Sequence, residues 1–252
     1  MNKNILVLTA SAFCTCVLSA MAQPGMGGPP AGPKLGPDMA KILGENTAFS
    51  ANLEFVTTPP RGGTMTMPGK IAYLEGKSRF EMDMGKVQGG NVPPNQAAQM
   101  KQMGMDQIIT ISRYDKKVVE IIMPSLKGYY EQPLTDAAST KAPADFKADI
   151  TELGKETLDG HPCVKNKYSI TSPEGGVQTS TVWNATDLNR FPIKIEVNEP
   201  SGKVVMHFTD IVTARPDAAL FEPPSDLKKY DNMMSLIMSK MGGMQMPMGG
   251  RQ

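Results

Sequence analysis

The sequence is poor in the residues from which most catalytic and nucleic-acid-binding sites are built. Its 252 residues include two histidines and one tryptophan, and the formal net charge is +1. The histidines, His161 and His207, lie in different segments, and no serine stands in the context of a nucleophile elbow. Basic residues do not cluster as they do in nucleic-acid-binding proteins. We therefore expect no enzymatic activity, no catalytic residues and no nucleic-acid partner.

Long apolar segments are also missing, except for one near the N-terminus. Lys3 precedes an apolar run over residues 5–18, and small residues follow at Ala20 and Ala22. This order is that of a secretory signal peptide, which we assign to residues 1–22 with cleavage after Ala22. No later segment approaches the roughly 20 apolar residues that a membrane-spanning helix requires. We expect an exported, soluble protein without a membrane span.

Cysteine is scarce, and cleavage would leave a single one. Cys14 and Cys16 lie in the signal peptide, so only Cys163 remains and no internal disulfide can form. His161 and Cys163 could together clip one metal ion, but no second pair of such ligands follows. A lone cysteine in an exported protein is either buried as a small apolar residue or paired with another molecule. We favour burial of Cys163.

The two ends of the exported chain differ in composition from its middle. Residues 23–37 are rich in glycine and proline and are interpreted as a flexible linker, because this composition buries too little apolar surface to become ordered. Residues 38–229 are long enough for one domain with a sizeable core. Residues 230–252 are expected to form a methionine-rich helix over 230–241, with Met234, Ile237, Met238 and Met241 at helical spacing, and then a disordered tail.

Within the domain, apolar and polar residues mostly alternate. Phe49, Leu53 and Phe55 are separated by polar residues in the pattern of a strand with one buried face. Similar patterns predict about ten strands, at residues 49–55, 71–75, 79–84, 108–112, 118–123, 150–158, 164–171, 177–185, 193–198 and 204–212. Helical patterns over 38–44 and 95–103 are short. We predict a mainly β fold, in which short helices plug the apolar, concave face of one large curved antiparallel sheet.

Several motifs resemble a known family. They are residues 49–84 (FSANLEFVTTPPRGGTMTMPGKIAYLEGKSRFEMDM), the hairpin at 114–117, the segments 153–157 and 159–163, VWNATDLNRFPIKIEV at 182–197, and ALFEPP at 219–224. Their order is similar to that of the LolA/LolB-like periplasmic lipoprotein-carrier superfamily, and closest to its uncharacterised exported members. The resemblance implies an incomplete β-barrel of about eleven strands with an apolar cavity for acyl chains. It also implies a periplasmic location, and a polar gate residue for which Arg79 is the nearest positional match.

An apolar pocket on the concave face would be lined by side chains from the buried faces of the strands. The candidates are Leu53, Phe55, Phe80, Met82, Ile109, Ile111, Ile121, Met123, Trp183, Ile195 and Phe208. Such a pocket would hold a hydrophobic ligand by buried area, at about 25 cal/mol per Å². A fully packed core without any ligand remains the alternative.

Methionine is unusually abundant, with 20 residues, and crowds the C-terminus. Thioether sulfur is a soft ligand that suits Cu(I), so Met241, Met244, Met246 and Met248 are candidate metal ligands. Methionine also fills irregular apolar gaps, which needs no metal. No other cofactor is expected.

The function that these patterns favour is that of an exported binding or carrier protein, with a lipid, an acyl chain or another apolar molecule as its ligand. Lipoprotein acyl chains are included among the ligands that the resemblance implies. Copper binding by the C-terminal methionines is one alternative. A non-catalytic structural or sensing module of the envelope, with a protein partner, is the other.

Overall fold

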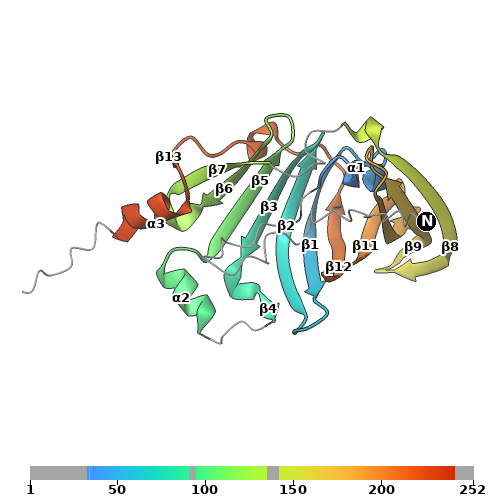
Figure 1. The fold of residues 1–252 in the computed structure, drawn as a ribbon, viewed down its shortest axis with the longest axis horizontal. Coiled ribbons are helices and arrows are strands. Elements are labelled where there is room, and N and C mark those ends of the chain that lie inside the picture. The colour runs from blue at the N-terminus through green and yellow to red at the C-terminus, as the bar shows by residue number, and fades with distance from the viewer. Residues whose placement is uncertain (1–32, 34, 91–94, 135–141, 242–252) are drawn as a thin grey trace, which may run out of the picture.

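Figure 1 shows the computed structural model of the protein, which describes residues 33, 35–90, 95–134 and 142–241. The strands are β1 (Ala48–Thr58), β2 (Met65–Leu74), β3 (Lys77–Asp83), β4 (Gln88–Gly89), β5 (Gln107–Arg113), β6 (Val118–Met123), β7 (Gly128–Pro133), β8 (Lys147–Leu158), β9 (His161–Thr171), β10 (Val177–Ala185), β11 (Phe191–Glu199), β12 (Gly202–Val212) and β13 (Lys228–Tyr230). The α-helices are α1 (Met39–Leu43), α2 (Gln96–Gln102) and α3 (Met233–Met241). Short 3-10 turns are η1 (Met84–Lys86), η2 (Pro124–Leu126), η4 (Pro143–Asp145) and η5 (Ala218–Phe221). The predicted fold class, mainly β with a few short helices, is confirmed.

All the strands belong to one curved sheet. Its order is β13-β7-β6-β5-β3-β2-β1-β12-β11-β10-β9-β8, and β4 pairs with β2 beside this path. The pairs are antiparallel except for β13, which runs parallel to β7. The sheet starts at β13 and ends at β8, so it forms an open half-barrel, as predicted (Figure 1). The short strands β4 and β13, and β7 between Gly128 and Pro133, were not among the predicted strands.

The alternation in the sequence gives each strand an inner and an outer face. In β1, Phe49, Leu53 and Phe55 are buried on the inner face, and Asn52 and Glu54 between them are exposed. Residues opposite one another in an antiparallel pair point to the same face of the sheet, so the register carries this assignment from strand to strand. The inner faces together form one continuous apolar cluster, which runs from Leu35 to Leu236.

Aromatic rings occupy the centre of this inner cluster. Phe49 packs edge-on against Phe191, with 4.8 Å between ring centroids, and lies 6.1 Å from Phe208 and 5.6 Å from Tyr73. Helix α1 covers the cluster near β11 and buries Met39, Ile42 and Leu43 against it. The expectation that a helix plugs the concave face therefore holds for α1.

The outer face is not uniformly polar, contrary to the prediction of one polar face. Ala72, Leu74, Ile111 and Ile122 form a second buried cluster there, together with Phe221 of η5. The alternation rule fails at this place because a later segment of the chain crosses the sheet and buries part of its outer face. This segment then adds β13 to the edge of the sheet at β7 and leads into α3.

The two predicted ends are only partly described. Leu35 lies within the predicted linker, but it is 1% exposed and packs in the inner cluster, so the packed part of the chain begins before residue 38. Helix α3 begins at Met233, not at residue 230, and it buries Leu236. Met234 and Met238, at the spacing noted in the sequence, are exposed instead, because Leu236 defines the packed side. The predicted signal peptide and the predicted disordered tail, residues 242–252, lie outside the described residues.

Candidate functional site

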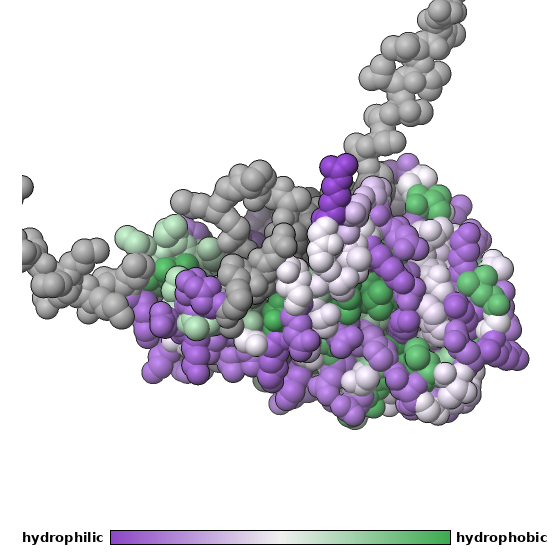
Figure 2. Space-filling view, turned by 90° about the horizontal axis from the view of Figure 1, so that it is seen from below, coloured by the Kyte–Doolittle hydropathy of each residue, from purple (hydrophilic) through white to green (hydrophobic). Residues whose placement is uncertain are grey.

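The inner face brings together most of the predicted pocket residues. Leu53, Phe55, Phe80, Met82, Ile121, Met123, Ile195 and Phe208 all belong to its single apolar cluster. None of these eight side chains is more than 4% exposed. Seen from below the view of Figure 1, hydrophilic residues form most of the described surface, and hydrophobic residues appear between them as separate patches (Figure 2). The apolar residues of the strands are thus mostly turned inward.

Two predicted pocket residues, Ile109 and Ile111, lie on the wrong face. Ile111 is opposite Arg79 in the register and belongs to the outer cluster, against which Ile109 also packs. The neighbouring Ile108 faces inward, opposite Met82. The sequence places Ile108 and Ile109 side by side, so the period of two leaves the phase of this strand undetermined. The prediction took the phase that the structure contradicts.

Trp183 is a third predicted pocket residue that the register places on the outer face. It lies opposite Lys165 and Lys194, whereas the adjacent Val182 lies opposite the inward-facing Ile195. The two lysine Nζ atoms lie 4.7 and 4.5 Å from the centre of the indole ring, and Trp183 Nε1 donates to Glu156 Oε1 at 2.6 Å. Although the register places it on the outer face, Trp183 is 6% exposed and belongs to the apolar cluster, and its ring also makes these two cation-π contacts.

A hollow of about 640 Å³ opens at the end of the half-barrel where the β2–β3 and β5–β6 turns lie. Its lining is formed by Leu35, Gly36, Pro37, Ala40, Lys41, Gly44, Thr47, Tyr73, Glu75, Gly76, Tyr114, Asp115, Pro143 and Ala144. We call it the rim hollow. Leu35 and Tyr73 also belong to the inner cluster, and Tyr114 packs against that cluster. The rim hollow is therefore continuous with the apolar inner face.

The wall of the rim hollow depends on Gly36. A Cβ atom at this position would lie 2.7 Å from Asp38 Oδ1 and 2.9 Å from the hydroxyl oxygen of Tyr114, so only glycine allows this close approach. Burial raises the pKa of Tyr73 above its ordinary value. Lys41 is half-buried, and Glu75 and Asp115 are exposed. An apolar interior with a polar mouth is the result. No pattern in the sequence signals this site, since its residues come from four separate segments.

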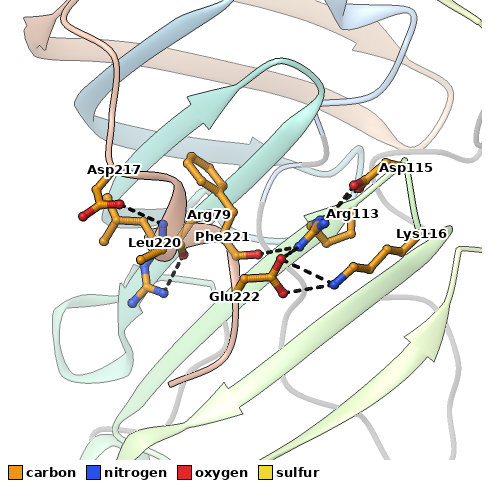
Figure 3. Close-up of polar contacts among 9 residues, drawn as sticks. Arg79, Arg113, Asp115, Lys116, Asp217, Leu220, Phe221 and Glu222 are labelled. Atoms are coloured by element: carbon orange, nitrogen blue, oxygen red, sulfur yellow. Dashed lines mark hydrogen bonds and ion pairs between the residues drawn. The ribbon is translucent and has the colours of Figure 1, made fainter. Parts of the chain in front are cut away.

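Arg79, the predicted gate residue, does not face the concave side. It lies on the outer face of β3, where Nε donates to Glu81 Oε1 at 2.7 Å. Its Nη1 donates to the carbonyl oxygen of Leu220 at 3.1 Å (Figure 3). It therefore holds η5 against the outer face of the sheet. The prediction that it gates the concave face is wrong, because Phe80 is the residue of this pair that points inward.

Arg113 is the more deeply buried anchor of the same segment, and the sequence analysis missed it. Its side chain is 5% exposed, and Nη1 donates to the carbonyl oxygen of Phe221 at 2.9 Å and to the carboxylate of Glu222. Nε and Nη2 donate to the two carboxylate oxygens of Asp115 at 2.9 and 2.8 Å. This fork lowers the pKa of Asp115 to about 2. Figure 3 shows Arg113 and Lys116 converging on the segment that carries Glu222.

The metal hypothesis concerns residues that the structure mostly leaves undescribed. Met244, Met246 and Met248 lie outside the described residues, and Met241 ends α3 without a described side chain. Copper binding therefore stays a prediction. In the described ranges, no three His, Cys, Asp or Glu side chains gather in a way that could hold a metal ion. Cys163 is buried, as expected, and burial raises the pKa of its thiol. Among the described helices, none is long and apolar enough to cross a membrane.

Comparison with known proteins gives one family and several similar folds. The sequence profile of DUF4412, a domain of unknown function, matches residues 57–190. The lipoprotein LppX of Mycobacterium tuberculosis is 11% identical, with a TM-score of 0.40 over 69% of this chain and 91% of that one. A LolA superfamily protein of Nitrosomonas europaea is 14% identical, with a TM-score of 0.39 over 73% and 94%. LprF of Mycobacterium bovis is 11% identical, with a TM-score of 0.37 over 72% and 97%.

The motifs of this chain resemble the LolA superfamily, and a protein of that superfamily is among these similar structures. The matched domain of unknown function agrees with the expectation of an uncharacterised member. A comparison with proteins of curated function gives no match.

Proposed function

The chain belongs to the DUF4412 family, a domain of unknown function, and from this premise we propose that it is an exported, non-catalytic binding protein for apolar molecules. The ligand would be an acyl chain or a lipid whose apolar part lies in the rim hollow, at one end of the inner face of the half-barrel. The continuity of the rim hollow with the inner cluster, through Leu35 and Tyr73, is the observation that carries this proposal.

The size of the rim hollow suits such a ligand. Pockets of about 300–1,000 Å³ typically hold small molecules, and the rim hollow has about 640 Å³. Each buried methylene group contributes about 0.8 kcal/mol, so about ten of them would contribute the roughly 8 kcal/mol of a micromolar complex. Lys41, Glu75 and Asp115 at the mouth would remain in contact with water and with a polar head group. This arrangement supplies affinity through buried area and needs no reactive group.

A substitution that fills the rim hollow with a larger side chain tests the proposal. The chain from residue 23 onward is titrated with a fluorescent fatty-acid analogue, and unlabelled fatty acid then competes for the site. Ala40 lines the rim hollow from α1, so Ala40→Trp should fill it and weaken binding at least tenfold. Ala98→Trp, on the exposed side of α2, is the matched control and should bind like the wild type. Equal binding by the Ala40→Trp variant, or no binding by the wild type, would overturn the proposal.

A further inference from the structure

A single C-terminal segment ties the outer face of the sheet to the edge where α3 lies. We call residues 217–230 the strap. Phe221, 1% exposed, inserts into the outer cluster between Leu74, Ile111 and Ile122. The strap then reaches the edge of β7, where Lys228 donates its backbone N–H to the carbonyl oxygen of Lys127 at 3.2 Å and β13 pairs with β7. Helix α3 follows directly, so the position of α3 depends on the strap.

The strap and α3 also close one end of the inner face. Gly128 of β7 faces inward, and a Cβ atom there would lie 2.7 Å from the ring of Tyr230 and 2.8 Å from Leu236. Leu236 is fully buried in the inner cluster, and Met233 and Ile237 pack against that cluster. Lifting the strap and α3 would therefore uncover the inner face beside β7.

A carboxylate with one buried, unpaired oxygen lies on the outer face of β6, close enough to Glu222 of the strap to feel its charge. Glu120 of β6 is 3% exposed, and its Oε2 atom has no hydrogen-bond partner in the described part of the protein. The register places it on the outer face, opposite Ile111 on one side and Glu131 on the other. Burial, and then the negative charge of Glu222 on the strap, raise the pKa of Glu120 to about 7.

Charged groups from every neighbouring element act on Glu120. Glu222 and Glu131 oppose its ionisation, whereas Lys116 and Arg113 favour it. Lys229 of β13 is ion-paired with Glu131, with 2.6 Å between Nζ and Oε2, and also feels the charge of Glu120. The two cations that favour the ionisation of Glu120, Arg113 and Lys116, are both ion-paired with Glu222. The contact of Arg113 is made by Nη1, and Lys116 Nζ lies 3.0 Å from Glu222 Oε2. Within the described ranges, Arg113 and Lys116 form their ion pairs with Glu222 and Asp115, and neither is ion-paired with Glu120.

We propose that the strap is a proton-sensitive latch, closed while Glu120 is neutral and loosened when Glu120 ionises. A neutral Glu120 neither repels Glu222 nor needs hydration. An ionised Glu120 is a buried charge whose Oε2 atom has no hydrogen-bond partner among the described residues, and it gains water when the strap lifts. Because the open state hydrates the carboxylate, ionisation shifts the equilibrium toward opening. Opening frees α3 from the inner face. The consequence for ligand access rests on the proposed function, whereas the latch itself does not.

Hydrogen exchange at the β13 amides measures the latch directly. Exchange is expressed as protection factors, which removes the intrinsic pH dependence of amide exchange. If Glu120 titrates near 7 while the strap is closed and near its ordinary value of 4.5 once exposed, protection should fall about tenfold between pH 6 and pH 8. Glu120→Gln, a neutral mimic, should show the same protection at pH 6 and at pH 8, and this protection should exceed that of the wild type at both pH values.

Glu199 supplies the matched control. Its Oε1 atom is also buried without a hydrogen-bond partner among the described residues, and burial raises its pKa, but it lies at the end of β11, far along the sheet from the strap. Glu199→Gln should retain the tenfold pH response. A flat wild-type profile, or the same tenfold response in the Glu120→Gln variant, would overturn the latch. Binding of the fluorescent fatty-acid analogue, measured on the same samples, separates the two proposals. If protection of the strap changes with pH but the analogue does not bind, the proposed function is wrong and the latch is still supported.

Discussion

Different kinds of contact stabilise the inner face and the outer face of the half-barrel. The inner face is one apolar cluster to which nearly every long strand contributes, from Phe49 on β1 to Phe208 on β12. On the outer face, the strap is held by one inserted ring, that of Phe221, and by two arginines, Arg79 and Arg113. Burial on the inner face is shared among many side chains. On the outer face it depends on a few directed bonds.

This difference separates stability from regulation. Apolar contacts contribute in proportion to buried area and do not change with pH, so the inner face should set the free energy of unfolding. Ion pairs and hydrogen bonds to carbonyl groups depend on the charge of each partner, so the strap should respond to pH and to single substitutions. A protein that binds apolar ligands can thus keep a stable scaffold and still have one segment that moves.

Truncation of the central aromatic ring should give the largest effect. Phe49 is fully buried and contacts the rings of Tyr73, Phe191 and Phe208. Phe49→Ala should lower the free energy of unfolding by about 3–5 kcal/mol, because it removes buried area and leaves a cavity. Urea denaturation measures this loss. Val177→Ala, at a side chain that is 63% exposed, should change it by less than about 0.5 kcal/mol. A cost below about 1 kcal/mol for Phe49→Ala would mean that the inner face is not close-packed.

Loss of the buried arginine should have an intermediate effect that is confined to the strap. Arg113→Met leaves the carbonyl of Phe221 without its side-chain donor and leaves Glu222 with Lys116 alone, at a cost of about 2 kcal/mol. Hydrogen exchange should locate the loss in β13 and α3. Arg61→Met, at an exposed position, is the control and should leave both regions unchanged. Equal loss of protection in β1 and β12 would show that the strap and the core unfold together.

The same substitution should alter the acid limb of the stability profile. In the native state Arg113 holds the pKa of Asp115 at about 2, below its ordinary value of 3.8. A lowered native pKa gives a contribution that is complete above pH 3.8 and lost as the pH falls toward 2. Arg113→Met should remove this contribution, so the wild type and the variant should converge as the pH falls through that window.

The fold could largely be predicted from the alternation of residues along single strands. Phe49, Leu53 and Phe55 on β1, and Ile193, Ile195 and Val197 on β11, are buried as their spacing indicates. The rule gave no answer at β5, because Ile108 and Ile109 are adjacent and both phases look alike. It also could not foresee that Phe221, more than 90 residues after Ile122, would cover the outer face of the sheet. Periodicity indicates which side chains of a strand face a buried layer. It does not indicate that a distant segment crosses the other face, because that contact forms only in the tertiary structure.

The candidate site was less predictable than the fold. Its inner-face residues follow from periodicity, but the rim hollow is assembled from α1, two turns and η4, and Leu35 belongs to a segment whose composition indicates a linker. Trp183 is predicted to line the pocket from the apolar face of its strand, although its cross-strand neighbours are two lysines. Arg113 gave no signal, since its partners Phe221 and Glu222 are distant in sequence. Long-range pairing decides all of these positions.

The smallest effect on stability should come from an exposed pair of arginine and glutamate. Its groups are the same as those that Arg113 brings together with Glu222, but they are not buried. Arg215 contacts Glu75 through two bonds, at 2.6 and 3.3 Å, and lowers the pKa of its carboxyl group. Both side chains are more than half exposed, at 61% and 53%, so water competes for their charges and side-chain ordering opposes the attraction. Arg215→Gln should leave the denaturation midpoint unchanged within error, at low and at high salt. If Arg215→Gln lowered the free energy of unfolding as much as Arg113→Met, burial would not explain why Arg113 stabilises the strap. The distinction between the two faces would then have to rest on the geometry of the contacts alone.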